Sequence, residues 1–336
     1  HTRLLTQSRG LGDVYKRQSV HQPPEQSLWS GRLDLEDGDA GRRWHQVVAF
    51  AQPAAPGIAL LGLASDRGVT LNKGRPGAAA GPEALRRNLA NLAWHHECSL
   101  YDDGDIIVTD DLPAGQQAYG DRLAGLLQQE QFVLGLGGGH EIAWAGYLGC
   151  RQYLDAHAPG KVLGILNLDA HFDLRRPSPD ASSGTPFYQV AQHCGDAGRA
   201  FHYACLGVAR TANTRALFQR ADELRVDYLL DTEFSLSRVE TLLRQFLSRL
   251  DYLYFTCCLD VFAACHAPGV SAPAALGLEP ARVIEVMHLV GELCREYAVT
   301  WLQADVAELS PVHDLDSRTA RLGARVLDTL VAARLS

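Results

Sequence analysis

Two carboxylates and an imidazole alternate in the stretch Asp169-Ala170-His171-Phe172-Asp173. The stretch follows an apolar run at 162–166, which is typical of a buried strand. If the backbone stays extended past that strand, its alternation places the three polar side chains on one side. Oxygen and nitrogen ligands at this spacing suit a divalent ion such as Mn, Fe, Co or Zn. The alternative is a strand end with solvated acids and one hydrogen-bonded histidine.

Polar side chains follow three other apolar runs of the chain in the same way. The residues at these run ends are His140, Cys258, Asp260 and Glu308. In an open parallel sheet the carboxyl ends of the strands share one edge, and ligands bind there. The sequence therefore predicts one site that is assembled from four separate strand ends.

The elements that must position these residues alternate between apolar runs and helical segments. The predicted strands are 57–63, 106–108, 132–136, 162–169, 201–208, 252–258 and 299–306. The predicted helices begin near 81 and 142 and cover about 114–129, 214–224, 281–297 and 317–333. This alternation predicts a single three-layer α/β domain, with a mostly parallel sheet of about eight strands and helices on both faces. No element is assigned between 225 and 251.

The beginning of the chain differs from the rest. Residues 1–18 show neither the apolar region of a signal peptide nor a helical stripe, and they resemble vector-derived or assembly-derived sequence. We therefore expect residues 1–20 to be non-native or disordered, and residues 21–336 to form the single catalytic domain.

Composition excludes several classes of partner. The 336 residues carry a net charge of -8 without a Lys/Arg cluster, which argues against nucleic acid and anionic membranes. No apolar run is long enough to span a bilayer. The eight cysteines have no regular spacing, so we expect free thiols and a cytoplasmic protein.

Several common enzyme motifs are absent from the sequence. It contains no G-x-G-x-x-G fingerprint, no phosphate loop with G-K-[ST], no G-x-S-x-G elbow and no C-x-x-C pair. Nucleotide-dependent enzymes, serine hydrolases, zinc ribbons and dithiol redox centres are thereby disfavoured. A metal-assisted hydrolase is the class that remains.

The polar motifs, taken in order, resemble the metal motifs of the arginase/agmatinase (ureohydrolase) superfamily. They are Gly137-Gly138-Gly139-His140, Asp169-Ala170-His171-Phe172-Asp173, Cys258-Leu259-Asp260 and Glu308. The resemblance extends from Trp29 to the C-terminus and is strongest to the formimidoylglutamase branch. The segments that indicate this branch are 29–32, 72–75, 139–144, 173–175, 183–187 and 267–273. The resemblance implies an arginase-like fold.

The resemblance also implies a binuclear site for two divalent ions, of which Mn²⁺ is the expected metal. His140 and Asp173 would bind one ion, His171 and Asp260 would bind the other, and Asp169 would bridge both. A hydroxide between the ions would attack the formimidoyl carbon of N-formimidoyl-L-glutamate. The products would be L-glutamate and formamide, as in histidine degradation.

Two carboxylates would act directly on the substrate in this scheme. Asp173 lies beside the hydroxide and would move its proton to the leaving amine. Glu308 would pair with the positively charged amidine through a charge-assisted contact. The alternative for Glu308 is a surface acid that follows a strand.

Cys258 departs from the family pattern, which has Asp-x-Asp at this point with the first Asp as a second bridging ligand. A thiolate can bridge metals, but it favours Zn²⁺ or Fe²⁺ over Mn²⁺. Three interpretations follow: a sulfur-bridged pair of ions, one tight and one weak ion, or a buried thiol that binds no metal. Strand alternation points Cys258 the same way as Asp260, which favours a ligand.

Arg175 is the candidate for binding a carboxylate of the substrate. A guanidinium offers a two-pronged donor that lysine lacks, and Arg175 lies two residues after Asp173. A solvated loop arginine is the alternative. Asn72 and Arg75 are weaker candidates for the same role, and Ser183 stands where relatives with guanidino substrates often carry histidine.

Two other functions remain open at this point. The same machinery could hydrolyse a guanidino compound, such as agmatine or guanidinobutyrate, and release urea. A non-catalytic member that keeps the fold for binding or assembly is the alternative from another class, because Cys258 alters the ligand set. In the catalytic cases the partner is a small-molecule substrate, and we expect a homo-oligomer.

Overall fold

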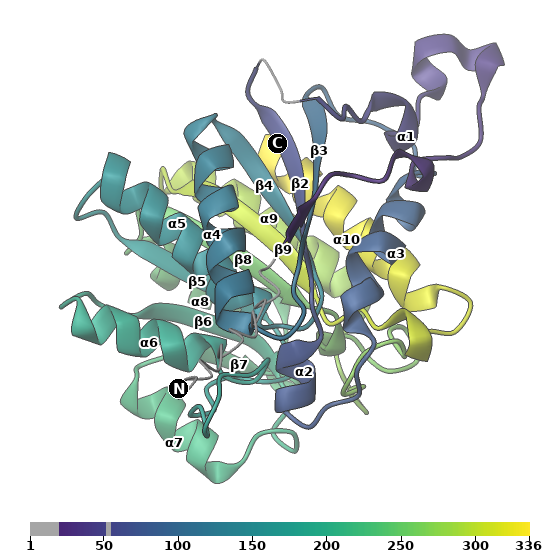
Figure 1. The fold of residues 1–336 in the computed structure, drawn as a ribbon. Helices are drawn as coiled ribbons and strands as arrows, with labels where there is room; N and C mark the ends of the chain where they lie inside the picture. The colour runs from purple at the N-terminus through teal and green to yellow at the C-terminus, as the bar shows by residue number, and fades with distance from the viewer. Residues whose placement is uncertain (1–19, 52–54) are drawn as a thin grey trace, which may run out of the picture.

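The computed structural model describes residues 20–51 and 55–336. Their strands form one sheet in the order β1-β3-β2-β4-β9-β8-β5-β6-β7 (Figure 1). Neighbouring strands are parallel, except that β1 runs antiparallel to β3. The strands are β1 (Val20–Gln22), β2 (Gly57–Ala64), β3 (Ser99–Ile107), β4 (Gln131–Gly137), β5 (Leu163–Leu168), β6 (His202–Val208), β7 (Asp227–Leu230), β8 (Tyr252–Cys258) and β9 (Thr300–Ala307).

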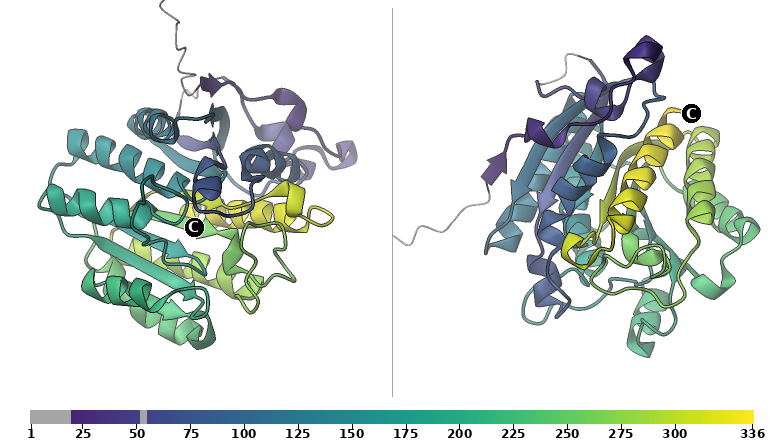
Figure 2. Two further views of the ribbon diagram at one scale, coloured as in Figure 1. Left: turned by 60° about the horizontal axis from the view of Figure 1, so that its bottom comes forward. Right: turned by 90° about the vertical axis from the view of Figure 1, so that its right-hand side faces the viewer.

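Helices cover both faces of the sheet (Figure 2). The short ones are α1 (Trp44–Val47) and α2 (Arg67–Leu71). The longer ones are α3 (Gly81–Leu89), α4 (Leu112–Gln128), α5 (Ile142–His157), α6 (Pro186–Asp196), α7 (Arg215–Glu223), α8 (Leu236–Leu247), α9 (Pro280–Glu296) and α10 (Arg318–Leu335).

Strand alternation creates a separate hydrophobic core on each face. In β2, Leu60 packs into the core beneath α3, α8, α9 and α10, whereas Leu61 packs into the core beneath α4, α5, α6 and α7. In β4, Leu134 packs into the first of these cores and Val133 into the second. Successive strand side chains point to opposite faces, so strands covered on both sides must be apolar throughout.

The predicted fold class is confirmed: the structure is a single three-layer α/β domain with a mostly parallel sheet. The prediction was about eight strands, and the sheet formed by the described residues has nine. The unassigned region between 225 and 251 contains β7 and α8. The predicted boundary of residues 1–20 lies outside the described residues, apart from Val20 in β1.

The largest error in strand assignment concerns β3. The sequence predicts a strand at 106–108, whereas the strand begins at Ser99 and includes buried Asp102 and Asp103. Buried Arg86 donates to both oxygens of Asp102 at 2.9 Å and to Asp105 at 2.7 Å. Acidic residues resemble a loop in the sequence, but Arg86 allows Asp102 to be buried in a strand, and Arg122 does the same for Asp103.

The order of the strands creates the site. The chain places β5, β6 and β7 outward in succession, and then returns to insert β8 and β9 between β5 and β4. The four central strands are therefore β4, β9, β8 and β5, and all four are parallel. Ligands bind at the carboxyl ends of strands where the order reverses in this way.

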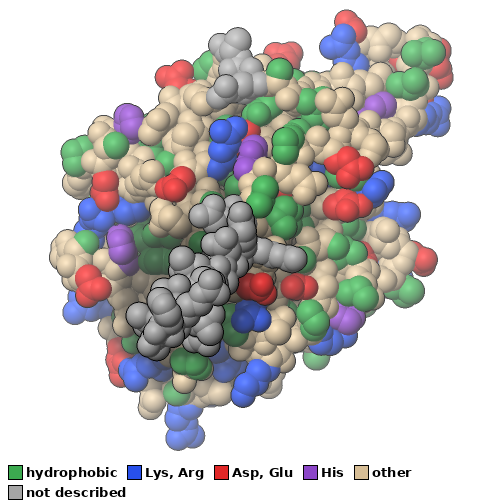
Figure 3. All heavy atoms as spheres, in the orientation of Figure 1, with side chains coloured by type: hydrophobic (Ala, Val, Ile, Leu, Met, Phe, Trp, Pro, Cys, Tyr) green, Lys and Arg blue, Asp and Glu red, His purple; other side chains and the backbone are tan. Residues whose placement is uncertain are grey.

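On the face shown in Figure 3, the described residues form no concentration of positive charge. Basic and acidic side chains are interspersed there (Figure 3), as the net charge of -8 leads one to expect. None of the helices in the described ranges is both long and apolar enough to cross a membrane.

Candidate metal centre and active site

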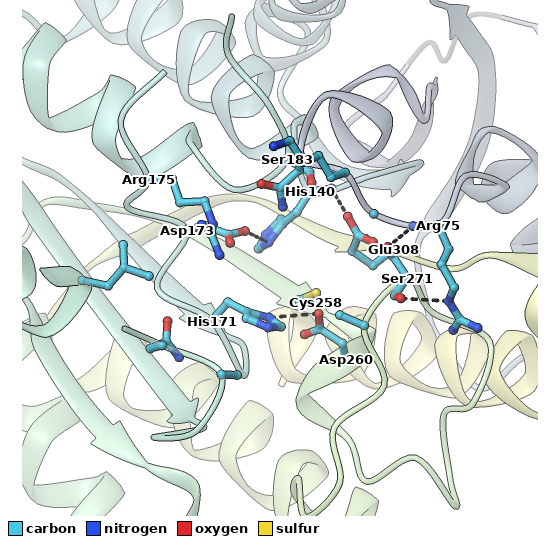
Figure 4. Close-up of a pocket in the computed structure, with 17 residues that line it drawn as sticks. Arg75, His140, His171, Asp173, Arg175, Ser183, Cys258, Asp260, Ser271 and Glu308 are labelled. Carbon is cyan, nitrogen blue, oxygen red and sulfur yellow. Dashed lines mark hydrogen bonds and ion pairs between the residues drawn. The ribbon is translucent and has the colours of Figure 1, made fainter. Parts of the chain in front are cut away.

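The predicted metal ligands come together at the carboxyl ends of the four central strands, and Figure 4 shows all of them except Asp169. His140 follows β4, and Cys258 is the last residue of β8. Asp169 follows β5 directly, and Asp260 lies in the 3-10 turn Leu259–Val261 after β8. Glu308 follows β9. Side chains far apart in the sequence are thus brought to one position by the parallel sheet.

Asp169 lies at the centre of this group and faces both histidines. Its Oδ2 is 2.9 Å from Nδ1 of His140, and its Oδ1 is 3.5 Å from Nδ1 of His171. The carboxylate is oriented by the side-chain amide of Asn167, which donates to Oδ2, and by the backbone N–H of His171, which donates to Oδ1. One oxygen is therefore directed to each half of the site, as a bridging ligand requires.

Each histidine has a second carboxylate of its own. Oδ2 of Asp173 is 2.9 Å from Nδ1 of His140, and Oδ2 of Asp260 is 3.1 Å from Nδ1 of His171. This pairing has the same division into two halves that the family resemblance implies. The sulfur of Cys258 lies within 4.8 Å of ligand atoms of both His140 and Asp169, so it belongs to the first half.

The unpaired atoms of the cluster fit a cation. Nδ1 of His140 and Oδ1 of Asp260 are buried and form no hydrogen bond within the described residues. Nδ1 is 2.9 Å from an oxygen of Asp169, yet the two are not aligned as donor and acceptor. Buried polar atoms normally have partners. Nitrogen, oxygen and sulfur atoms that converge without bonding one another are the donor set of a metal site.

The electrostatics of the cluster show how it behaves without a cation. Burial lowers the pKa of His140, but Asp169 and Asp173 outweigh it and raise this pKa well above its ordinary value. His171 responds in the same way to Asp260 and Asp169. Since a histidine must be neutral to bind a metal, the two imidazoles must lose protons when ions bind.

The carboxyl groups and the thiol are shifted as well. Burial, together with the charge of Asp169, raises the pKa of Asp173 to about 6. Burial opposes the shift at Asp169, but contacts with His140 and His171 hold its pKa below the usual range. Burial, followed by the charges of Asp169 and Asp260, raises the pKa of Cys258. The thiol is therefore protonated until a cation displaces the proton.

Glu308 lies beside the cluster and faces the same cavity. Its Oε1 accepts a 2.8 Å hydrogen bond from the backbone N–H of His140, and only 5% of the residue is exposed. Burial and the charge of Asp260 raise its pKa to about 8. The backbone is left-handed at both Glu308 (φ 71°) and Asp173 (φ 47°). Such angles are uncommon outside glycine and cluster at functional sites.

The cluster opens into a cavity of about 320 Å³ that contains every predicted substrate-binding residue: Asn72, Arg75, Arg175 and Ser183. Arg175 donates its backbone N–H to Gly184, and its guanidinium has no ion pair within the described residues. The guanidinium of Arg75 instead donates to the carbonyls of Val270 and Ser271 at 2.6 and 3.0 Å. Arg75 therefore fastens the loop that follows β8, and Arg175 is the stronger candidate for binding an anion.

Two residues near the site escaped the sequence interpretation. Ser271 lines the cavity from a segment whose sequence indicates the formimidoylglutamase branch, but its position gave no sign of contact with Arg75. The amide of Asn213 donates to the carbonyls of Ala170 and Ala209, and its oxygen accepts from the backbone of Phe172. It holds the Asp169–Asp173 stretch in place, and no local pattern in the sequence predicts this role.

Comparison with known proteins identifies the family. The model of the arginase family matches residues 56–332. A formimidoylglutamase from Hahella chejuensis is 48% identical, over 93% of this chain and 95% of the relative. The chain belongs to the arginase family. A formimidoylglutamase from Chromobacterium violaceum is 45% identical, over 90% of this chain and 96% of the relative. The family predicted from the sequence motifs is confirmed.

Solved structures of the family share the fold. The formimidoylglutamase of Bacillus subtilis superposes with a TM-score of 0.75 at 20% identity, over 88% of this chain and 93% of the other. The formiminoglutamase of Trypanosoma cruzi with Mn²⁺ superposes with a TM-score of 0.71 at 24% identity, over 84% and 95%. Family membership makes the chain a hydrolase that acts on an amidine carbon–nitrogen bond.

Proposed function

We propose that this chain hydrolyses N-formimidoyl-L-glutamate to L-glutamate and formamide, as a step of histidine degradation, with two divalent ions. The observation that carries the proposal is Asp169, whose two oxygens face His140 and His171 beside a cavity that contains Arg175. Relatives of 45% and 48% identity that are named formimidoylglutamase support this choice of substrate. The cavity of about 320 Å³ is lined by both acidic and basic groups, which suits a substrate with an amidine and two carboxylates.

The proposed ligands form two overlapping sets. His140, Asp173 and Cys258 would hold one ion, His171 and Asp260 would hold the other, and Asp169 would serve both. Bound ions would supply hydroxide from water at neutral pH and stabilise negative charge near the amidine carbon. Carboxylates and imidazoles favour Mn²⁺, whereas the thiol of Cys258 moves the preference toward Zn²⁺ or Fe²⁺.

Glu308 binds and orients the amidine in this proposal. The backbone N–H of His140 fixes one of its oxygens at 2.8 Å, which leaves the other oxygen for an N–H of the substrate. Burial and the charge of Asp260 raise the pKa of Glu308, so a positive charge beside this carboxyl favours its ionised form. A protonated amidine supplies that charge, so the pairing selects the cationic substrate.

Asp173 moves the proton that the leaving group needs. Oδ2 of Asp173 lies against Nδ1 of His140, which leaves Oδ1 for a proton. A carboxylate oxygen beside the reacting groups can accept a proton from the attacking water and pass it on. The proton is delivered to the α-nitrogen of the substrate, whose bond to the formimidoyl carbon then breaks and releases L-glutamate.

Arg175 holds a carboxylate of the glutamate part of the substrate. Its guanidinium lines the cavity and forms no ion pair with a carboxylate among the described residues. A substrate carboxylate can therefore pair with it through two hydrogen bonds. The proposal further includes the cytoplasm as the location, because all eight cysteines are free thiols, and a homo-oligomeric assembly.

The test combines metal analysis with an assay of products. Protein purified without added metal is reconstituted with Mn²⁺, Zn²⁺ or Fe²⁺, and its metal content and turnover of N-formimidoyl-L-glutamate are measured. We expect about two ions per chain and formamide as the product. Asp260→Asn should lose one ion and nearly all turnover. Among the described residues, Asp260 is the only carboxylate besides the shared Asp169 in the half of the cluster that contains His171.

The outcome separates the three functions. Release of urea from agmatine or guanidinobutyrate, without formamide release, would establish the guanidino alternative. Metal content without turnover of any of these substrates would establish a non-catalytic member of the family. Light scattering on the same protein tests the proposed homo-oligomer.

A further inference from the structure

A chain of buried polar side chains lies behind His140, on the side away from the other candidate ligands. Nε2 of His140 is 3.0 Å from the hydroxyl of Thr256. That hydroxyl is 2.5 Å from Oδ1 of Asp305, whose Oδ2 accepts from the hydroxyl of Tyr254 at 2.5 Å. Thr256, Asp305 and Tyr254 are all 0% exposed.

The sheet itself sets this arrangement. Thr256 in β8 and Asp305 in β9 are direct partners in the parallel register of the two central strands. Tyr254 precedes Thr256 by two residues, so alternation places its side chain on the same face. The aromatic ring of Phe187 packs edge-on against the imidazole of His140 at 5.6 Å between centroids. The imidazole is therefore confined by packing as well as by its hydrogen bond.

The direction of the hydrogen bonds follows from the supply of protons. A threonine hydroxyl has one hydrogen to donate, whereas an ionised carboxylate only accepts. Thr256 must therefore donate to Asp305, and its oxygen accepts from the N–H at Nε2 of His140. A neutral imidazole with its proton on Nε2 has its lone pair on Nδ1. Nδ1 is the atom that lies 2.9 Å from oxygens of both Asp169 and Asp173.

We propose that Thr256 and Asp305 are positioning residues that hold His140 in the one tautomer and orientation in which Nδ1 can bind a metal ion. This inference rests on the metal centre of the proposed function. Partners behind a metal-binding histidine commonly fix its tautomer, and their loss typically weakens metal binding or activity by 10- to 100-fold. Within the described residues, no other side chain is hydrogen-bonded to Nε2 of His140.

The two halves of the cluster differ in this respect, which makes the inference specific. His171 is 25% exposed at its side chain, and its imidazole has no hydrogen bond to a hydroxyl or carbonyl within the described residues. Thr256 and Asp305 therefore position only the half of the cluster that contains His140, Asp173 and Cys258. A change in Thr256 should weaken one of two ions and leave the ion at His171 and Asp260 in place.

The experiment is a metal titration of the full chain at pH 8. Free Mn²⁺ is followed by its electron paramagnetic resonance signal in the wild type, T256V, T256S and T329V. T256V removes the hydroxyl with little change in shape, and T256S keeps the hydroxyl. T329V is the matched control, because Thr329 is also buried but bonds only to the backbone of Arg325 in α10.

We expect one of the two Mn²⁺ affinities, that of the ion at His140, to fall by about 10- to 100-fold in T256V, and the other to stay unchanged. T256S and T329V should stay within about threefold of the wild type in both affinities. The proposal would be wrong if T256V bound both Mn²⁺ ions with the affinities of the wild type. Should T256V fail to fold, D305N decides in its place, with the same expected loss at one ion and the same refuting result. A wild-type protein that binds none of Mn²⁺, Zn²⁺ and Fe²⁺ refutes the proposed function instead, so the two failures are distinguishable.

Discussion

Replacing Arg175 tests how the substrate is recognised. In Arg175→Ala the cavity keeps its candidate metal ligands but loses a guanidinium that has no carboxylate partner in the described protein. Arg176 is the natural control, because it is the next residue, is also exposed and lies 5.9 Å from the ring of Tyr188, outside the cavity. The two variants therefore remove the same charge from adjacent positions.

The magnitude follows from the contact that is lost. A hydrogen bond to a charged group is worth about 1.5–3 kcal/mol. At about 1.4 kcal/mol per factor of ten, kcat/KM should fall by about 10- to 150-fold in Arg175→Ala. The carboxylates of the substrate do not change during the reaction, so most of the loss should appear in KM rather than in kcat. Arg175→Lys should keep part of the affinity, because it keeps the charge but not the paired donors.

The assay measures initial rates of formamide release for the wild type, Arg175→Ala, Arg175→Lys and Arg176→Ala. Two further substrates identify the carboxylate that is bound. N-formimidoyl-4-aminobutyrate lacks the α-carboxylate, and N-formimidoyl-2-aminobutyrate lacks the γ-carboxylate. One of these analogues lacks the carboxylate that Arg175 holds. On that analogue the kcat/KM of Arg175→Ala should differ little from that of the wild type, because the interaction is already absent.

Either of two results refutes the reasoning. Arg176→Ala could raise KM as much as Arg175→Ala, which would indicate a general effect of surface charge. Alternatively, the ratio between Arg175→Ala and the wild type could be the same for all three substrates, which would mean that Arg175 binds neither carboxylate.

Three further predictions concern the metals and stability. Cys258→Asp should retain or increase Mn²⁺-dependent turnover and lose any preference for Zn²⁺. The measurement is activity after reconstitution with each metal. A variant that binds no metal at all would show that residue 258 is wrongly placed in the motif. Arg86→Met should lower the free energy of urea unfolding by about 3–5 kcal/mol, because it leaves Asp102 buried without its partner. The exposed control Arg87→Met should cost less than about 1 kcal/mol. The free energy of unfolding of the metal-free protein should fall as the pH rises from about 4 to 8. The fall is up to about 1.4 kcal/mol per pH unit for each carboxyl whose pKa is raised by folding, and urea unfolding at several pH values measures it.

The sign of the pH effect follows from the direction of the shifts. Folding raises the pKa of Glu308 from 4.5 to about 8 and that of Asp173 from 3.8 to about 6. Between the unfolded and folded pKa values the folded state binds more protons, so the stability that these two carboxyls contribute is present at low pH and is lost as the pH rises through the folded pKa values. Stability of the metal-free protein that increases from pH 5 to pH 8 would contradict these assignments.

The sequence was informative wherever polar residues follow a long apolar run. His140, Asp169 and Glu308 are each preceded by a buried strand, and parallel strands must end at a common edge, so their convergence could be predicted. The division into two halves depended on the family resemblance, since sequence spacing does not tell which carboxylate lies beside which histidine. Metal binding by these residues remains a prediction that the proposed titrations test.

Other features could not be predicted because they depend on contacts between distant residues. Asp102 resembles a loop residue until Arg86 is placed beside it. Thr256 and Asp305 are ordinary polar residues within apolar strands, and their role depends on the register between β8 and β9. The strand β7 has only four residues, with Leu229 alone buried, and so it lacks the long apolar run of a central strand.

The left-handed backbone at Asp173 and Glu308 restricts how this site can change. Side chains in this conformation cost of order 1–3 kcal/mol each, and glycine, asparagine and aspartate tolerate it best. Random mutagenesis that selects only for heat resistance should therefore favour Glu308→Gly, which relieves the backbone and removes the group proposed to face the amidine. Engineering a more durable form of this protein will need a screen for turnover at every round, because the replacements that relax these two positions are the ones expected to abolish it.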